Sequence, residues 1–494
     1  MSRPSPKSLT LAAVALAAIG GLAARLIVLR SSLGTLDSDE AVVGLMARHF
    51  EHGHLQAFFA GQAYGGTIEA GVAAALFALF GSSALALKCV PLVLDAGAAI
   101  VTWRIGLRLA GPRTAVLAAV LMWLWPATYL WWSIKERGFY EAGLCLTLLG
   151  ALFVVRIAQQ PQRAPWPDWA ALGLLAGLGW WQTPQVVYVI APAAVWLLWR
   201  VRASAWRAIA AAPAFLLGAA AWIWPNVHDG FASLRPPPSP VKGAYMDHLV
   251  TLAHVGGPMT FGLRTPYTTL WLHPARLSQL LYLVAVAVVA AGCARGWRGG
   301  RLVGVVLVVL PFLHALLPLA GTVAEGRYTL FALPWLALAI AHRASHRLAA
   351  AVVLVVVVGV TVAGLASMRG QTDPYAPDRH VPRSLASLKE GLAAHHVRRL
   401  WANYWVAYRL TFETREQMIA APASSDRFPQ YSAVVAADPA AAHVFMSGSH
   451  TDAIFHAALD SHHIAYDRWT AGPDWVVYVP HARVGPTDFD NTYP

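Results

Sequence analysis

Apolar runs of membrane-crossing length fill most of this chain. A transmembrane helix needs about 20 predominantly apolar residues, and the pattern predicts about eleven such helices joined by short loops. The predicted runs are 8–29, 84–107, 113–133, 139–158, 168–183, 186–200, 206–224, 277–294, 301–320, 327–343 and 348–367. We therefore expect a polytopic α-helical membrane domain over residues 1–367.

The arginines of the short loops indicate which side each loop occupies. Cytoplasmic loops are rich in Lys and Arg. A cytoplasmic N-terminus places the basic loops, near 104–113, 156–163, 200–207, 295–301 and 343–347, on the inside. This orientation requires the short apolar stretch 68–82 to lie in the outer interface without crossing. The first run lacks a small-x-small cleavage site, so we expect an uncleaved anchor in the plasma membrane.

The pattern changes after residue 367, where apolar positions become local and polar residues more frequent. Alternating helical and extended periodicity predicts a small α/β domain over 368–494. Its predicted helices lie near 383–395, from Tyr404 onward and near 452–459, and its predicted strands lie at 397–402, 443–446 and 475–479. An odd number of membrane crossings places this domain outside the cell.

The composition agrees with a membrane protein. Hydrophobic residues make up 57% of the chain and charged residues 13%, with a mean hydropathy of +0.50, whereas soluble proteins carry about 25% charged residues. The net charge of +12 reflects the basic loops and does not indicate a nucleic-acid partner. Three cysteines within or at the ends of apolar runs predict no disulfide framework. The sequence contains no Walker A, GxGxxG, HExxH or CxxC motif, which argues against nucleotide hydrolysis and zinc proteolysis.

Charged residues that the inside rule does not explain gather in four predicted external regions. These regions are 30–83, the turn 133–138, the loop 225–276 with its proline-rich run at 236–240, and the segment 320–328. Ionisable residues at a membrane boundary are costly and often functional. We therefore expect a reaction or binding site at the outer surface.

Three acids open the first of these regions, at Asp37, Asp39 and Glu40. Apolar residues at helical spacing follow them, so Asp37 or Ser38 is a candidate N-cap. An alternative is that one carboxylate accepts a proton as a general base, with a pKa raised by burial and by its acidic neighbours. The Asp-x-Asp spacing of Asp37 and Asp39 is also a candidate for holding a divalent ion.

Further candidates follow in the same external regions. Glu69 comes after the turn at Gly65-Gly66, either as a capping acid or as a second carboxylate facing the site. The basic residues beside the spans either reach toward lipid headgroups or bind a phosphate leaving group. The residues that we expect to bind substrate are Tyr64, Glu69, Lys135, Arg137, Glu141, Gln182, Arg327 and Tyr328.

Several short motifs together resemble the GT-C superfamily of membrane glycosyltransferases, in the branch of the protein O-mannosyltransferases and the lipid A aminoarabinose transferase. The motifs are Asp39-Glu40 followed by Ala-x-x-x-x-x-Ala, Tyr-Gly-Gly-Thr-Ile-Glu-Ala at 64–70, Leu-Phe-Gly-Ser at 79–82, Ala-Leu-Lys at 86–88, and Arg-Tyr leading to Pro at 327–334. The resemblance covers roughly residues 8–343.

The resemblance implies transfer of a sugar from a polyprenyl-phosphate donor in the bilayer to a glycan, lipid or protein acceptor at the outer leaflet. It implies that Asp39 is the base, that Glu40 is the second acid of the pair, and that Glu69 is the downstream acid. Asp37 departs from the family pattern and leaves metal dependence open. Charge and topology assign Lys135, Arg137 and Arg327 to phosphate binding.

Other functions share some of these features. A transporter or flippase of lipid-linked sugars is typically built from repeats and broken helices, and no repeat is visible in this sequence. A polysaccharide polymerase or ligase uses the same donor chemistry without the acid pair of the first loop. A binding module anchored in the membrane needs far fewer spans.

Overall fold

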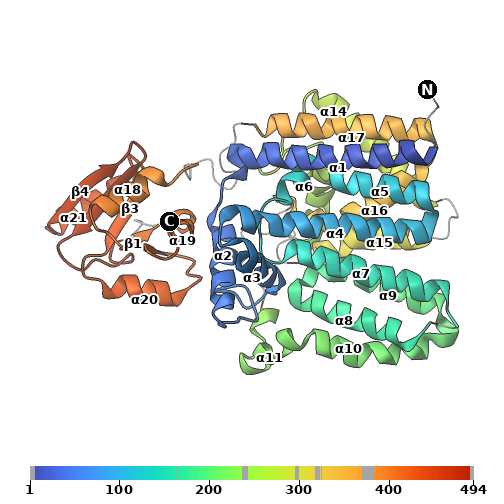
Figure 1. Cartoon of the computed structure of the whole chain (residues 1–494), viewed down its shortest axis with the longest axis horizontal. Coiled ribbons are helices and arrows are strands. Elements are labelled where there is room, and N and C mark those ends of the chain that lie inside the picture. The colour runs from blue at the N-terminus through green and yellow to red at the C-terminus, as the bar shows by residue number, and fades with distance from the viewer. Residues whose placement is uncertain are drawn as a thin grey trace.

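The computed structural model describes residues 6–162, 164–235, 243–294, 300–317, 323, 325–369 and 383–489, with side chains from residue 11. A bundle of helices forms one part of the molecule and a small α/β part lies at one end of it (Figure 1). The predicted proline-rich run, part of segment 320–328 and pieces of two basic loops lie outside the described residues.

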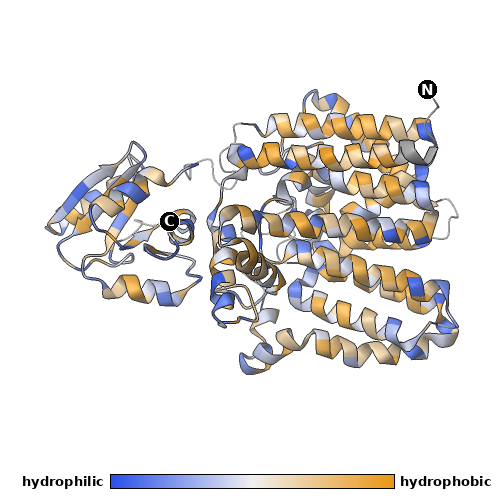
Figure 2. Ribbon diagram, viewed as in Figure 1, coloured by the Kyte–Doolittle hydropathy of each residue, from blue (hydrophilic) through white to orange (hydrophobic). Residues whose placement is uncertain are grey.

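The long helices of the bundle lie side by side, and apolar residues cover most of their length (Figures 1 and 2). Their bounds are α1 (Pro6–Arg30), α4 (Ala84–Ala110), α5 (Pro112–Leu124), α6 (Ala127–Trp132), α7 (Tyr140–Gln159), α8 (Trp166–Gln182), α9 (Val187–Arg200), α10 (Ala211–Gly218), α11 (Ala220–His228), α14 (Ala275–Ala294), α15 (Gly300–Ala315), α16 (Leu333–Arg343) and α17 (Arg347–Ser367). The short helices α12 (Tyr245–Thr251) and α13 (Gly257–Thr260) lie between α11 and α14.

Every predicted run coincides with helix, but the helices are shorter and more broken than the runs. Among the described residues, five helices are long and apolar enough to cross a membrane, namely α1, α4, α7, α14 and α17. A sixth candidate is the pair Arg202–Gly218 and Ala220–His228, which is bent by 59°. The run 113–133 is divided into α5 and α6 at Pro126, which has no N–H for a helical hydrogen bond. The number of crossings, and the side on which each end lies, stay predictions.

Two short helices occupy the loop between α1 and α4, at the end of the bundle beside the α/β part (Figure 1). They are α2 (Ser38–Glu51) and α3 (Ile68–Phe80). With 13 residues, α3 extends over about 20 Å, less than the 30 Å hydrocarbon core. Its length agrees with the predicted helix that does not cross.

The α/β part is built on a sheet in strand order β2-β1-β3-β5-β4 within the described residues 383–489. Strand β1 pairs parallel with β2 and β3, whereas β5 pairs antiparallel with β3 and β4. The elements are α18 (Ala386–Ala394), β1 (Arg399–Ala402), α19 (Tyr404–Glu413), β2 (Ile419–Pro422), α20 (Pro429–Ala437), β3 (Ala442–Met446), α21 (His450–Ser461), β4 (Tyr466–Ala471) and β5 (Trp475–Pro480). The sequence pattern predicted these elements except β2, α20 and β4.

The hydrophobic core of the bundle extends into the edge of the α/β part, because α19 packs against α2. The ring of Phe412 stacks on that of Phe77, with 6.2 Å between their centroids. The guanidinium of Arg48 lies 4.2 Å from the centroid of the Phe412 ring. A Cβ at Gly44 would lie 2.4 Å from a ring carbon of Phe412, so this close approach requires glycine. Tyr404 contacts Asp39 near the start of both helices and Phe412 contacts Arg48 further along, so the helices run parallel.

A buried ion pair between two helices of the bundle also holds the basic turn 133–138 in place. Arg25 on α1 lies 2.5 Å from a carboxylate oxygen of Asp95 on α4. The same guanidinium donates from Nε to Ser133 Oγ at 2.7 Å. Because an unpaired charge is very costly among apolar helices, this pair ties α1, α4 and the turn 133–138 together.

Candidate functional site

The acids of the first loop begin α2. Asp37 is its N-cap, accepts from the Glu40 N–H at 3.1 Å, and donates its own N–H to Glu40 Oε2 at 3.2 Å. This capping box confirms the expected N-cap at Asp37. It also fixes the directions in which the side chains of Asp37, Asp39 and Glu40 point from the start of α2.

Asp37 is bound by two cations. Arg137 donates from its two terminal nitrogens to the two oxygens of Asp37, at 2.9 and 2.8 Å, and Lys135 Nζ lies 2.9 Å from Oδ2. Burial alone would raise the pKa of Asp37, but the positive charges of Arg137 and Lys135 outweigh it and lower that pKa well below its usual range. Asp37 is therefore an ionised structural partner and a poor proton acceptor.

Glu40 is the centre of a second ion pair network. Its Oε1 accepts from Lys88 on α4 at 2.6 Å, and its Oε2 accepts from Lys135 at 2.7 Å. Lys135 also donates to the Thr35 carbonyl at 2.8 Å, so Thr35, Asp37 and Glu40 use the three N–H groups of its ammonium. Glu40 and Lys135 thus hold the turn 133–138 against α2, and neither leaves a free group for substrate in this arrangement.

Asp39 has different surroundings. Its side chain is 22% exposed, compared with 9% for Asp37 and 0% for Glu40. Oδ2 accepts from Arg137 at 3.2 Å, and Oδ1 accepts from the hydroxyl of Tyr404 in the α/β part at 2.6 Å. Of the three acids, Asp39 is the most accessible to a reacting group.

The cation that bridges Asp37 and Asp39 is an arginine. One terminal nitrogen of Arg137 contacts both carboxylates, so a divalent ion between them would have to displace it. Among the described residues, no group of three or more His, Cys, Asp or Glu side chains is arranged to hold a metal ion. We therefore assign no metal to the Asp-x-Asp pair.

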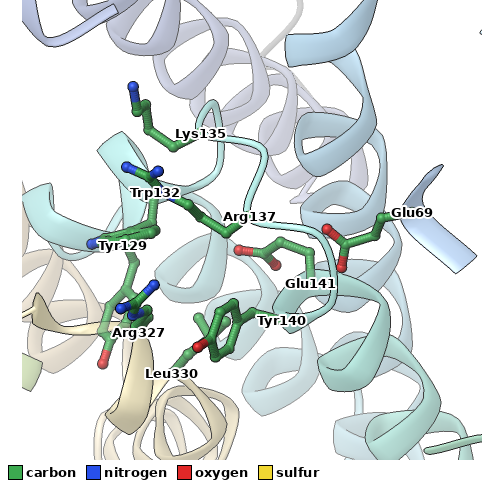
Figure 3. Close-up of a pocket in the computed structure, with 9 residues that line it drawn as sticks. All are labelled: Glu69, Tyr129, Trp132, Lys135, Arg137, Tyr140, Glu141, Arg327 and Leu330. Carbon is green, nitrogen blue, oxygen red and sulfur yellow. The ribbon is translucent and has the colours of Figure 1, made fainter. Parts of the chain in front are cut away.

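A narrow cavity lies behind Arg137. It is lined by Glu69, Tyr129, Trp132, Lys135, Arg137, Tyr140, Glu141, Arg327 and Leu330 (Figure 3). Its free volume for the centre of a water molecule is about 10 Å³, close to the room that one water needs. A phosphate or a sugar can enter only if lining side chains move.

Arg327 closes one side of this cavity. Its guanidinium pairs with Glu325 and lies 5.9, 5.5 and 5.1 Å from the ring centroids of Trp132, Tyr140 and Tyr328. Arg137 lies against the same Trp132 ring at 5.1 Å, and Figure 3 shows both arginines on the Trp132 side of the cavity. Two guanidiniums over one indole provide planar donors suited to a phosphate.

Carboxyl groups line the opposite side. Glu69 accepts from the Ala142 N–H at 2.8 Å and thereby caps α7 from a different helix. It also hydrogen-bonds Glu136, whose Oε1 accepts from the Gly138 N–H at 2.7 Å. Burial raises the pKa of both acids, and the charge of Glu69 raises that of Glu136 further. The buried pair therefore favours a state in which one of the two carboxyls is protonated and hydrogen-bonds the other.

No family model matches this chain, and no curated protein matches it. Among solved structures, ArnT from Cupriavidus metallidurans in the apo state matches with a TM-score of 0.60 and 13% identity, over 96% of this chain and 98% of that one. The same protein bound to undecaprenyl phosphate matches with a TM-score of 0.59, at equal identity and coverage. The chain has a GT-C fold.

The zinc- and sulfate-bound oligosaccharyltransferase of Archaeoglobus fulgidus shares this GT-C fold, with a TM-score of 0.51 and 11% identity, over 92% of this chain and 72% of that one. The sequence motifs therefore identified the correct fold although identity to these structures is low. The match to ArnT extends over nearly the whole chain, including its α/β part.

Three predicted substrate residues, Tyr64, Gln182 and Tyr328, lie around the cavity without lining it. The carbonyl and side chain of Gln182 accept from Gly66 and Ile68, and its amide donates to Gly138, which joins α8 to the first loop and the basic turn. Tyr64 packs edge-on against Phe139 at 6.4 Å. Direct contacts of Tyr64 and Gln182 with substrate stay predictions.

Sequence reasoning missed several residues of this site. Lys88 stood in the motif at 86–88 but was given no role, although a cation at the start of an apolar run is detectable. Trp132 and Tyr140 resembled ordinary boundary aromatics. Tyr404 and Arg427 gave no local signal, because they reach the first loop only through the packing of α19 on α2.

Proposed function

We propose that this protein is a glycosyltransferase that moves a sugar from a polyprenyl-phosphate donor to an acceptor at the outer face of the membrane, with Asp39 as general base. The observation that carries the proposal is the position of Arg137. It contacts the exposed acid Asp39 and also lines the cavity shared with Arg327. The proposed base therefore contacts one of the two arginines that we assign to the phosphate.

The reaction needs one base and one stabilised leaving group. An acceptor O–H or N–H attacks the anomeric carbon of the donor, and its proton passes to Asp39. The bond between that carbon and the phosphate oxygen breaks, and the phosphate leaves with the electron pair. Arg327 and Arg137 stabilise the negative charge that develops on the phosphate.

Arg327 is better placed than Lys135 to bind the phosphate. Lys135 has its three N–H groups engaged by Thr35, Asp37 and Glu40. Arg327 is paired with Glu325, and both side chains are partly exposed, at 18% and 20%. Binding of a phosphate to Arg327 requires Glu325 to leave it.

A lipid-linked donor suits this location. The polyprenyl tail stays in the bilayer, so the phosphate is delivered at a fixed depth without a nucleotide-binding motif. ArnT, which shares the fold, has been solved with undecaprenyl phosphate, and this supports a polyprenyl phosphate as the carrier lipid.

Transfer can be tested with purified protein in lipid nanodiscs and a set of radiolabelled undecaprenyl-phosphate sugars. We expect release of undecaprenyl phosphate for at least one sugar, and a loss of about 10²–10⁴-fold in Asp39→Asn, the usual range for a general base. Asp168→Asn is a matched control, because Asp168 begins α8 and pairs with Arg156 away from this site. Near-normal turnover by a folded Asp39→Asn variant would remove Asp39 from its role.

A further inference from the structure

We propose that Tyr404 is a positioning residue for Asp39, so that the active site is assembled from both parts of the chain. This inference rests on the proposed function, in which Asp39 is the base. The contact joins residues 365 positions apart. Tyr404 is the first residue of α19, while Asp39 lies in the first turn of α2.

The hydrogen bond to Tyr404 is the shortest one to Asp39. The Tyr404 hydroxyl lies 2.6 Å from Oδ1, whereas Arg137 lies 3.2 Å from Oδ2. Arg137 also makes two shorter bonds to Asp37, so it cannot follow Asp39 freely. Tyr404 therefore provides the tighter of the two contacts that hold the carboxylate.

The direction of this hydrogen bond is fixed by Arg427. Its Nε lies 3.5 Å from the Tyr404 oxygen and its guanidinium 5.8 Å from the Tyr404 ring. Because arginine can only donate, the phenolic proton is directed to Asp39. Burial and the negative charge of Asp39 raise the pKa of Tyr404 well above 10, so the phenol remains a donor at physiological pH.

Several contacts hold Tyr404 in place. The side chain of Asn403 accepts from the Val406 N–H at 3.1 Å and caps α19 immediately before Tyr404. Arg427 also lies 5.6 Å from the ring of Phe59 in the first loop. The phenol is thus anchored by its own helix and by an arginine that contacts both parts of the molecule.

The two contacts have a chemical consequence for the base. The terminal torsion of an aspartate is broad, so a carboxylate held at one oxygen can rotate. Tyr404 at Oδ1 and Arg137 at Oδ2 define its plane. Each carboxylate oxygen has a second acceptor position, which remains for the proton of the acceptor.

The test compares Tyr404→Phe with Tyr431→Phe in the full-length protein. Tyr431 is a matched control, because its hydroxyl contacts His49 near the far end of α2, about 15 Å along the helix from Asp39. We expect Tyr404→Phe to lower kcat about tenfold, the effect of one hydrogen bond to a charged group, with the donor KM within error of wild type. Its unfolding temperature should fall no further than that of Tyr431→Phe, which loses the hydrogen bond from its hydroxyl to the Glu416 carboxylate. We expect Tyr431→Phe to leave kcat unchanged.

Three results would overturn the inference. One is an unchanged or increased kcat in Tyr404→Phe while the wild type is active. Another is an equal fall of kcat in both variants, and the third is a fall of kcat in Tyr404→Phe accompanied by a lower unfolding temperature than that of Tyr431→Phe, since both indicate a loss of domain packing alone. If the wild type transfers sugar from none of the donors, the proposed function itself fails, which is a distinct outcome.

Discussion

The Nζ atom of Lys88 on α4 lies 2.6 Å from the Oε1 atom of Glu40 on α2, with both side chains almost fully removed from solvent. This pair joins the first loop to a long helix of the bundle. Removing one partner from a buried ion pair leaves the other charge without compensation, and this costs about 3–5 kcal/mol. Glu40 is therefore expected to matter chiefly for folding.

This relationship gives the first prediction. Glu40→Gln should lower the unfolding temperature and the yield of folded protein, and Glu40→Gln/Lys88→Met should recover part of the loss because it also removes the unpaired ammonium. Thermal unfolding in detergent measures both. A stable Glu40→Gln variant that cannot transfer sugar would instead indicate a direct catalytic role for Glu40.

The second prediction concerns the phosphate. Arg327→Ala should raise the donor KM about tenfold or more and leave the acceptor KM nearly unchanged, since a hydrogen bond to a charged group contributes about 1.5–3 kcal/mol. Steady-state kinetics against a polyprenyl-phosphate sugar measures both constants. Arg235→Ala, an exposed arginine in the loop after α11, is the control. Unchanged donor dependence in Arg327→Ala would exclude this arginine from phosphate binding.

The third prediction follows from the Glu69–Glu136 pair. Because the folded protein raises the pKa of Glu136 above 4.5, folding takes up a proton there. The contribution of this group to the free energy of unfolding is fully present below a pH of about 4.5. It is lost as the pH rises through the pKa that the group has in the folded state. Glu136→Gln keeps the hydrogen bonds of the protonated acid and should make the unfolding temperature fall less steeply between pH 5 and pH 8.

Unfolding temperatures measured across that pH range, at constant ionic strength, test this expectation. Glu51→Gln is the control, because Glu51 is exposed at the end of α2. Identical pH dependence in the wild type and Glu136→Gln would show that the buried pair does not hold an extra proton.

The fourth prediction tests the packing of α19 on α2. Gly44→Ala places a methyl group 2.4 Å from the Phe412 ring, and such overpacking costs about 1–3 kcal/mol, which exceeds the gain of up to about 1 kcal/mol in helix propensity. We expect a lower unfolding temperature and a lower kcat, because Tyr404 moves with α19. Gly71→Ala on α3 meets no atom within 4 Å and should be neutral or slightly stabilising.

A compensating change sharpens this test. Gly44→Ala/Phe412→Leu makes room for the methyl group and should restore part of the kcat lost in Gly44→Ala. If Gly44→Ala leaves both kcat and stability unchanged, the two helices can move apart enough to accept the methyl group, and their close contact does not determine the position of Tyr404.

The sequence predicted those features that depend on local pattern. Apolar runs located the helices, and the order of polar and apolar residues narrowed the N-cap of α2 to Asp37 or Ser38, of which the structure has Asp37. The break between α5 and α6 was missed because the apolar run continues through Pro126. Strand β2 has only four residues, which is too few for an alternation of apolar and polar positions to be recognised.

The candidate site was predictable only in its parts. The acids and the basic turn stood out as charges among apolar residues, yet their pairing depends on contacts across 48 to 100 positions. The charge pattern alone therefore did not distinguish Asp39 from the more deeply buried Asp37 and Glu40, and only the family resemblance singled it out. The contact of Tyr404 with this site could not be predicted from the sequence, since it depends on the packing of α19 on α2.

The contact between Tyr404 and Asp39 also sets an order in time. A ribosome makes the aspartate early and the tyrosine 365 residues later, so a nascent or truncated chain carries the acid without its phenol. Under the proposed function, full activity would then arise late in biogenesis, once α19 has packed against α2.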